Sequence, residues 1–157
     1  MLYAFYLNKS QGGNYYPDYF THIVANQSSG IIECFGYSSK IEPHETDASM
    51  KLFVDNKYLV RIVEGCNAVS IIILFMSFII SFAEKFKKTT FFLLAGGLLI
   101  YIVNLFRIAI LTIMYYEFPE YQETLHNIVF PAIIYGMVLL LWMIWVRMLP
   151  KTNTGNE

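Results

Sequence analysis

Residues 89–116 read TTFFLLAGGLLIYIVNLFRIAILTIMYY, 28 residues in which Arg107 is the only charge. A helix needs about 20 mostly apolar residues to cross the roughly 30 Å hydrocarbon core of a bilayer, so this stretch is long enough to span one. Residues 66–83 add 18 residues without a charge, and residues 127–146 add 20. The sequence therefore predicts an all-α polytopic membrane protein with three transmembrane helices.

The composition supports this prediction. Of the 157 residues, 56% are hydrophobic and only 15% are charged, and a soluble domain of this length cannot bury so many apolar side chains. The 13 Phe and 12 Tyr suit the aromatic belts of a membrane protein. A net charge of −1 argues against nucleic-acid binding, and the two cysteines are too few for a disulfide framework.

The basic residues of the loops predict the orientation. Residues 85–88 include three lysines, whereas the loop at 117–123 has three acids and no base. Arg147 and Lys151 follow the third stretch. Because lysine and arginine concentrate on the cytoplasmic side, residues 85–88 and the C-terminal tail are expected inside the cell. Residues 117–123, and the region before residue 66, are then expected outside a bacterial inner membrane.

The region before the first stretch is predicted to form a small extracytoplasmic unit, a helix followed by a hairpin. Asp18 is a helix-start residue and Gly36 a helix-end residue, and apolar residues between them recur at helical spacing. Cys34 lies in this pattern, where packing explains it. Residues 51–54 and 57–63 read as two strands joined by an Asp55-Asn56 turn.

These boundaries divide the chain into three parts. Residues 1–65 form the extracytoplasmic region, residues 66–149 the transmembrane core and residues 150–157 a polar cytoplasmic tail. Residues 1–7 are apolar but too short to span a membrane or to act as a signal peptide. We expect them to be the remnant of a further span that begins upstream.

Three reactive side chains are predicted to meet at the outer membrane face. Cys66 and His126 stand at the outer ends of their stretches, and Arg107 lies about 10 Å below the outer end of its helix. Each alone has an ordinary interpretation: a packed cysteine, a snorkelling arginine, a polar histidine anchor. Together a thiol and an imidazole form a nucleophile–base pair, and a fixed guanidinium can stabilise an oxyanion.

Further polar residues stand close to these three in the sequence. Asn104 is three positions before the arginine and so shares its helix face. Glu64 and Asn67 flank Cys66 and are candidate supporting groups. Arg61 reads better as a solvated charge. No spacing of His, Cys, Asp or Glu indicates a metal site.

The same residues carry a resemblance to a known family. Residues 64–68, Glu-Gly-Cys-Asn-Ala, resemble the cysteine motif of the exosortase/archaeosortase family, and Asn104-Leu-Phe-Arg107 resembles its N-x-x-R motif. His126 matches the family's histidine on the following helix. The resemblance covers residues 50–149 and is closest to the short F-type exosortases of Bacteroidetes-like bacteria. Two features differ: most exosortases have more spans, and Ser-Gly usually follows the cysteine.

The resemblance implies a membrane-embedded cysteine transpeptidase or protease, with Cys66, Arg107 and His126 as catalytic residues. Its substrates are exported proteins with a C-terminal sorting signal, which comprises a short motif, a transmembrane helix and a basic tail. No metal or organic cofactor is implied. Two alternatives remain: a non-catalytic membrane assembly subunit, in which Arg107 pairs with an acid of the partner, and a small transporter component, in which Arg107 lines a polar path.

Overall fold

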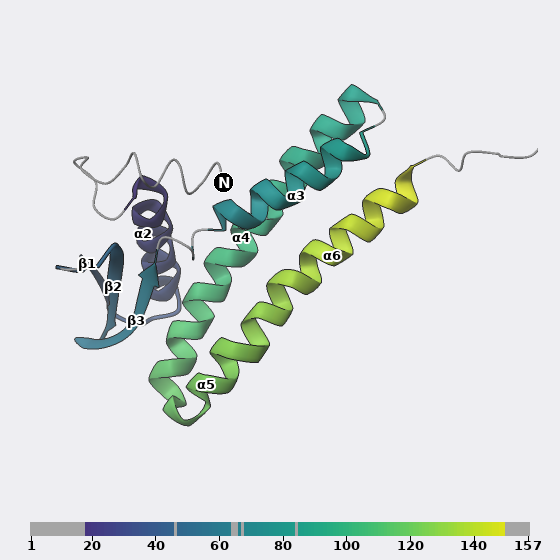
Figure 1. Ribbon diagram of the computed structural model, residues 1–157. Coiled ribbons are helices and arrows are strands. Elements are labelled where there is room, and N and C mark those ends of the chain that lie inside the picture. The colour runs from purple at the N-terminus through teal and green to yellow at the C-terminus, as the bar shows by residue number, and fades with distance from the viewer. Residues whose placement is uncertain (1–17, 46, 64–65, 67, 84, 150–157) are drawn as a thin grey trace, which may run out of the picture.

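The computed structural model describes residues 18–45, 47–63, 66, 68–83 and 85–149. The chain is mostly helical and has two parts, which meet along α4 (Figure 1). One part is α2 with a three-stranded sheet, and the other is the group of long helices α3, α4 and α6. The helices are α2 (Tyr19–Cys34), α3 (Val69–Ser81), α4 (Phe86–Glu117) and α6 (Phe130–Met148), and the strands are β1 (Ser39–Pro43), β2 (Ser49–Val54) and β3 (Lys57–Val63).

The helix predicted near the N-terminus is confirmed. The Asp18 carboxylate accepts hydrogen bonds from the backbone N–H groups of Phe20, at 3.1 Å, and Thr21, at 3.4 Å, and so caps α2. Gly36 follows the helix with φ of +93°, a conformation that glycine adopts without strain. The prediction that Cys34 is packed is wrong, because its side chain is exposed.

The predicted hairpin is also confirmed, but the sheet has one strand more than predicted. Asp55 and Asn56 have φ of +48° and +64° and form the two-residue turn between β2 and β3. The additional strand, β1, pairs antiparallel with β2, with Ile41 opposite Leu52. The all-α class therefore needs correction. β1 escapes prediction because its sequence, SKIEP, has little apolar alternation, so it depends on pairing with β2.

The sheet and α2 enclose a core against the second half of α4. Its buried apolar side chains are Val24, Ala25, Ile32, Met50, Leu52, Val54, Ile62, Leu105, Ile108 and Ala109. At the end of α4, Tyr37 donates a hydrogen bond of 3.0 Å to the Glu117 carboxylate. This bond raises the pKa of Tyr37, because the carboxylate favours the protonated phenol. The small unit is thus held against α4 by apolar and polar contacts.

A second core joins α3, α4 and α6. Its fully buried side chains include Phe75 on α3, Ile100 on α4 and Trp145 on α6. Gly96 lies directly beneath the Phe75 ring, so that a Cβ added there would lie 2.7 Å from Phe75 Cε1. The lack of a side chain at Gly96 is what lets α3 approach α4 closely.

Within the described residues, two helices are long and apolar enough to cross a membrane: α4, and the continuous helical segment Pro119–Met148 that ends in α6. Many of their large apolar side chains point away from the protein, including Phe91 (75% exposed) and Leu94 (71%) on α4. A soluble core helix would bury these groups, whereas lipid solvates them.

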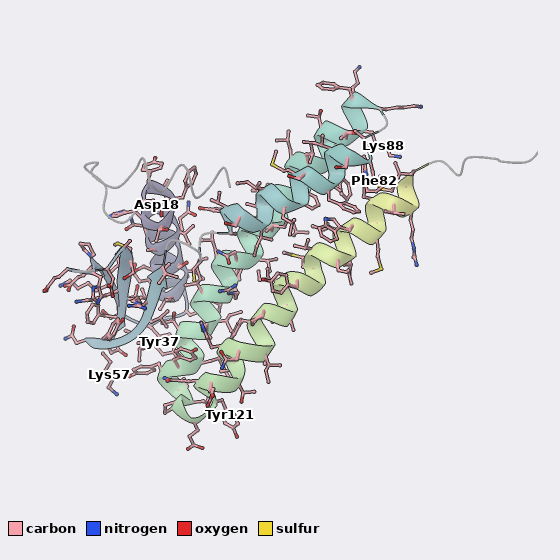
Figure 2. The ribbon with its side chains drawn as sticks, viewed as in Figure 1. Asp18, Tyr37, Lys57, Phe82, Lys88 and Tyr121 are labelled. Carbon is pink, nitrogen blue, oxygen red and sulfur yellow. The ribbon has the colours of Figure 1, made fainter. Side chains whose placement is uncertain are left out.

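The first predicted span is shorter than expected. Residues 66–83 form a helix only over Val69–Ser81, which is about 20 Å long at 1.5 Å per residue. It begins late because Ala68 has φ of +62°, a left-handed conformation that cannot continue a helix. Phe82 and Lys88 lie at one end of the helix group and Tyr121 at the other (Figure 2).

Candidate active site

Cys66 lies between the end of β3 and the start of α3. It is half-buried, is not part of a disulfide and packs against the core of the small unit. The prediction placed Cys66 at the first turn of its helix, but α3 begins three residues later, at Val69. Cys66 therefore belongs to the connection between the sheet and the helix group, not to α3.

A hydrogen bond attaches Cys66 to α4. Asn104 is almost fully buried, and its side-chain Nδ2 donates to the backbone carbonyl of Cys66 over 2.9 Å. These two residues are 38 positions apart in the sequence. The hydrogen bond holds Cys66 beside Asn104, which lies one helical turn before Arg107 on α4.

Arg107 is half-buried on α4 and borders two cavities. Its Nε–H is shielded from solvent and has no hydrogen-bond partner in the described part of the chain. An unpaired buried donor on a cation is costly and suits an anionic oxygen that arrives with a ligand. Within the described residues, the ion pairs found are those of Lys40, His44 and Arg61, so Arg107 has no acidic partner there.

His126 lies in η3 (Leu125–Val129), a turn of π-helix just before α6, and is exposed. Short helical pieces, η2 (Pro119–Tyr121) and α5 (Gln122–Thr124), connect this turn to α4. Pro131 follows in the first turn of α6, and because proline has no N–H it cannot donate to the carbonyl of residue 127. A widened π turn is a common result and often occurs at functional sites.

One cavity of about 250 Å³ brings Cys66, Arg107 and His126 together. It lies between β3, α4 and the π turn, and its other walls are Leu59, Val60, Arg61, Ile62, Ile108, Leu111 and Tyr115. The walls are mainly apolar, so charge inside the cavity is poorly screened. A thiol, an imidazole and a guanidinium thus share one small, partly enclosed space.

The other candidate residues fall elsewhere. Glu64 and Asn67 lie outside the described residues. His22 bonds to Asn26 over 3.0 Å, and His44 lies near Asp47, so neither histidine lines the cavity. Among the described residues, no group of three His, Cys, Asp or Glu side chains could hold a metal ion.

Sequence reasoning missed several cavity residues. Tyr115 is one: it follows Arg107 by eight positions and Leu111 by four, so a periodicity of four on α4 could have found it. The residues of β3 are the others. Arg61 was interpreted as a solvated charge, and it does pair with Asp47 over 2.7 Å, yet it also borders the cavity.

Comparison with known families identifies the chain. The model of the transmembrane exosortase family (Exosortase_EpsH) matches residues 14–148. The chain belongs to the transmembrane exosortase family. No curated protein and no solved structure matches it. Family membership and the apolar helices together establish an exosortase-type membrane protein.

Ala68, two positions after Cys66, has φ of +62°, a left-handed conformation that costs an alanine roughly 1–2 kcal/mol and that glycine would adopt without this cost.

Proposed function

We propose that this exosortase is a cysteine transpeptidase or protease that processes the C-terminal sorting signals of exported proteins. The observation that carries the proposal is the single cavity shared by Cys66, Arg107 and His126. Three residue types suited to acyl transfer come from three segments of the chain, and Arg107 offers a donor that has no partner among the described residues. The subgroup that fits best is the short F-type exosortase.

The proposed reaction begins with attack on a peptide bond. The Cys66 thiolate attacks the substrate carbonyl carbon, and the carbonyl oxygen takes up the negative charge. Arg107 stabilises this oxyanion, where one good donor contributes about 3 kcal/mol. The C–N bond then breaks, and His126 gives a proton to the leaving amine. A thioester between Cys66 and the N-terminal part of the substrate remains.

The second half of the reaction releases the product. An amine attacks the thioester in transpeptidation, or water attacks it in hydrolysis, and His126 takes the proton from the attacking group. The sulfur leaves as thiolate, which restores the starting state of Cys66. These steps are carried by side chains of the chain itself.

The depth of the site on α4 supports this proposal. From Phe86 to Asn104 the helix rises about 27 Å at 1.5 Å per residue, close to the roughly 30 Å hydrocarbon core. With the lysines at 85–88 in the cytoplasm, Cys66 stands at the outer boundary of the inner membrane. We propose that α3, with its uncharged flanks, crosses as a third span.

An adjoining cavity fits the substrate's hydrophobic segment. It has about 260 Å³, lies between α4 and η3–α6, and shares Arg107 with the first cavity. Apart from Arg107 its walls are apolar side chains such as Phe106, Ile110 and Ile133. A transmembrane helix that follows the cleaved peptide bond could contact the enzyme there.

Replacement of the nucleophile tests the proposal. Cys66→Ala should insert normally while an exported protein with a C-terminal helix stays unprocessed, and Cys66→Ser should be nearly as inactive, because a hydroxyl is a poorer nucleophile. Cys34→Ala is the matched control, since Cys34 lies exposed on α2, away from the cavity. Processing by Cys66→Ala at the wild-type rate would overturn the enzymatic assignment and favour an assembly subunit or a transporter component.

Orientation is tested separately with reporter fusions. A reporter joined after Lys88 should be active only inside the cell, and one joined after Glu120 only outside. The opposite pattern would place Cys66 and His126 in the cytoplasm, where exported substrates do not reach them.

A further inference from the structure

β3 is an edge strand that leads to Cys66. In the described part of the chain the sheet order is β1-β2-β3, so β3 pairs with β2 on one side only. An edge strand directs alternate N–H and C=O groups away from the sheet, where they can pair with another chain. β3 ends at Val63, three residues before Cys66. The β3 residues and Cys66, the proposed nucleophile, border the same cavity.

The first cavity follows this unpaired edge. Leu59, Val60, Arg61 and Ile62 all border it, and they are consecutive residues. Side chains of a strand point to opposite faces in turn, so a cavity on one face would touch only every second residue. Leu59 interrupts this alternation, but Val60, Arg61 and Ile62 beyond it also border the cavity in succession, so the cavity reaches the edge of the strand, where the main chain is within reach.

The two edges of the sheet are built differently. β1 carries an exposed ion pair between Lys40 and Glu42, with 2.6 Å between the charged atoms, and ends in Pro43. Charged residues and proline are the usual means of preventing a sheet edge from pairing. Along the cavity, β3 has three apolar side chains and Arg61, whose guanidinium is already held by Asp47. The β3 edge lacks the proline that ends the β1 edge.

The pairing of β2 with β3 is irregular next to the cavity. Leu52 is opposite Val60 and Phe53 is opposite Tyr58, so Leu59 is an extra residue in β3. Such a bulge turns the strand and re-aims the groups on it, and bulges are frequent beside active sites. The bulge lies within the segment that borders the cavity.

We propose that an extended polypeptide binds along the β3 edge as a fourth strand and so presents its peptide bond to Cys66. This inference rests on the proposed function and adds how the substrate is held. Hydrogen bonds between the two main chains would supply affinity for substrates of many sequences. The side chains that line the cavity would select which substrate residues fit beside Cys66.

The direction of the bound chain follows from the topology. β3 runs toward Cys66, and the chain then enters α3, which in the proposed orientation leads toward the cytoplasmic side. A substrate with an outer N-terminal part and a C-terminal helix in the membrane has the same polarity. Its segment before the cleaved bond therefore lies parallel to β3, and its helix descends beside α4 and α6.

Alkylation of Cys66 by peptide reagents tests the strand pairing. The probe is acetyl-trialanyl chloromethyl ketone, whose C–Cl bond breaks as Cys66 sulfur forms an S–C bond and chloride leaves. The full chain carrying Cys34→Ala is used in lipid nanodiscs, so that Cys66 is the one thiol. Iodoacetamide, which has no peptide to pair, gives the reference rate, and the rate of each reagent with Cys66 is divided by its rate with free cysteine, because the two electrophiles differ in intrinsic reactivity. The peptide reagent should react at least about tenfold faster, the gain expected from one or two hydrogen bonds.

Single N-methyl groups on the peptide amides provide the decisive pattern. Pairing with an edge uses every second residue, so methylation should slow alkylation by about tenfold at alternate positions and little between them. Equal effects at all positions, no effect at any, or a peptide reagent no faster than iodoacetamide would overturn the proposal.

Hydrogen exchange locates the effect on the enzyme. Backbone amides of β3 should exchange about tenfold more slowly in the peptide-labelled protein than in the iodoacetamide-labelled protein. β1 is the internal control, because it is the other edge of the same sheet and should not change. Protection of both strands, or of neither, would contradict pairing at the β3 edge.

The outcome is separable from that of the proposed function. Suppose that substrate processing depends on Cys66, while N-methylation gives no alternating pattern and the β3 amides gain no protection from exchange. In that case only the strand pairing is wrong. If the edge pattern is found but Cys66→Ala still processes substrate, peptide binding is supported and the catalytic assignment is wrong.

Discussion

The bond between Asn104 and Cys66 leads to a prediction that separates positioning from stability. Asn104→Ala removes the donor that holds the Cys66 carbonyl at 2.9 Å. The three proposed catalytic groups, the Cys66 thiol, Arg107 and His126, all remain. What is lost is the hydrogen bond that holds Cys66 to α4.

The expected size follows from the loss of one nearly buried hydrogen bond. A buried acceptor left without its donor costs about 1–3 kcal/mol, and the Cys66 carbonyl can shift toward another donor. A displacement of a reacting group by about 1 Å can lower a rate roughly 100-fold. We therefore expect kcat of Asn104→Ala to fall roughly 10- to 100-fold while KM changes little. Asn104→Asp should be at least as impaired, since a carboxylate would repel the carbonyl.

The assay combines substrate processing with alkylation of Cys66, both in the Cys34→Ala background. The matched control is Thr112→Val, because Thr112 is fully buried on the same helix and donates to the Ile108 carbonyl over 2.8 Å. This control also loses a buried hydrogen bond of α4, but Thr112 does not line the cavity. It should keep wild-type reactivity of Cys66.

Two results would refute the reasoning. Wild-type kcat and alkylation rates in a well-folded Asn104→Ala protein would show that the hydrogen bond does not position Cys66. Equal loss of activity in Asn104→Ala and Thr112→Val would show that both act through the general stability of α4.

Three other substitutions test the site and the helix packing. Arg107→Lys should insert normally and keep at most a few per cent of processing activity, since lysine keeps the charge but loses the planar donors; activity near wild type would argue against an oxyanion role. His126→Gln keeps a polar side chain but cannot pass a proton to the leaving amine, so it should lose most of its processing activity; processing near the wild-type rate would contradict the role of His126. Gly96→Ala should destabilise the protein by about 1–3 kcal/mol, because its Cβ would enter the Phe75 ring. Gly136→Ala, which meets nothing within 4 Å, should change thermal stability little, and equal shifts for the two would show that α3 and α4 are not closely packed at Gly96.

Local features of the sequence were sufficient for much of the fold. The length of apolar stretches indicates helices that cross a bilayer, and α4 and α6 follow from it directly. Capping by Asp18, the end of α2 at Gly36 and the Asp55-Asn56 turn also depend on neighbouring residues only. The unusual residues Cys66, Arg107 and His126 stood out because each is chemically reactive within or beside an apolar stretch.

The remaining features depend on contacts between distant residues. β1 exists only as a partner of β2, and the Asn104–Cys66 bond joins residues 38 positions apart. Whether Cys66, Arg107 and His126 share a cavity is decided by how the sheet and η3 pack against α4. The sequence by itself indicated which segments are long and apolar enough to cross a membrane and which side chains are chemically reactive, because hydropathy and side-chain chemistry are local. Only the tertiary structure decided that β3 borders the same cavity as Cys66. That placement results from packing between distant segments, and the local sequence of one segment does not indicate which other segment packs against it.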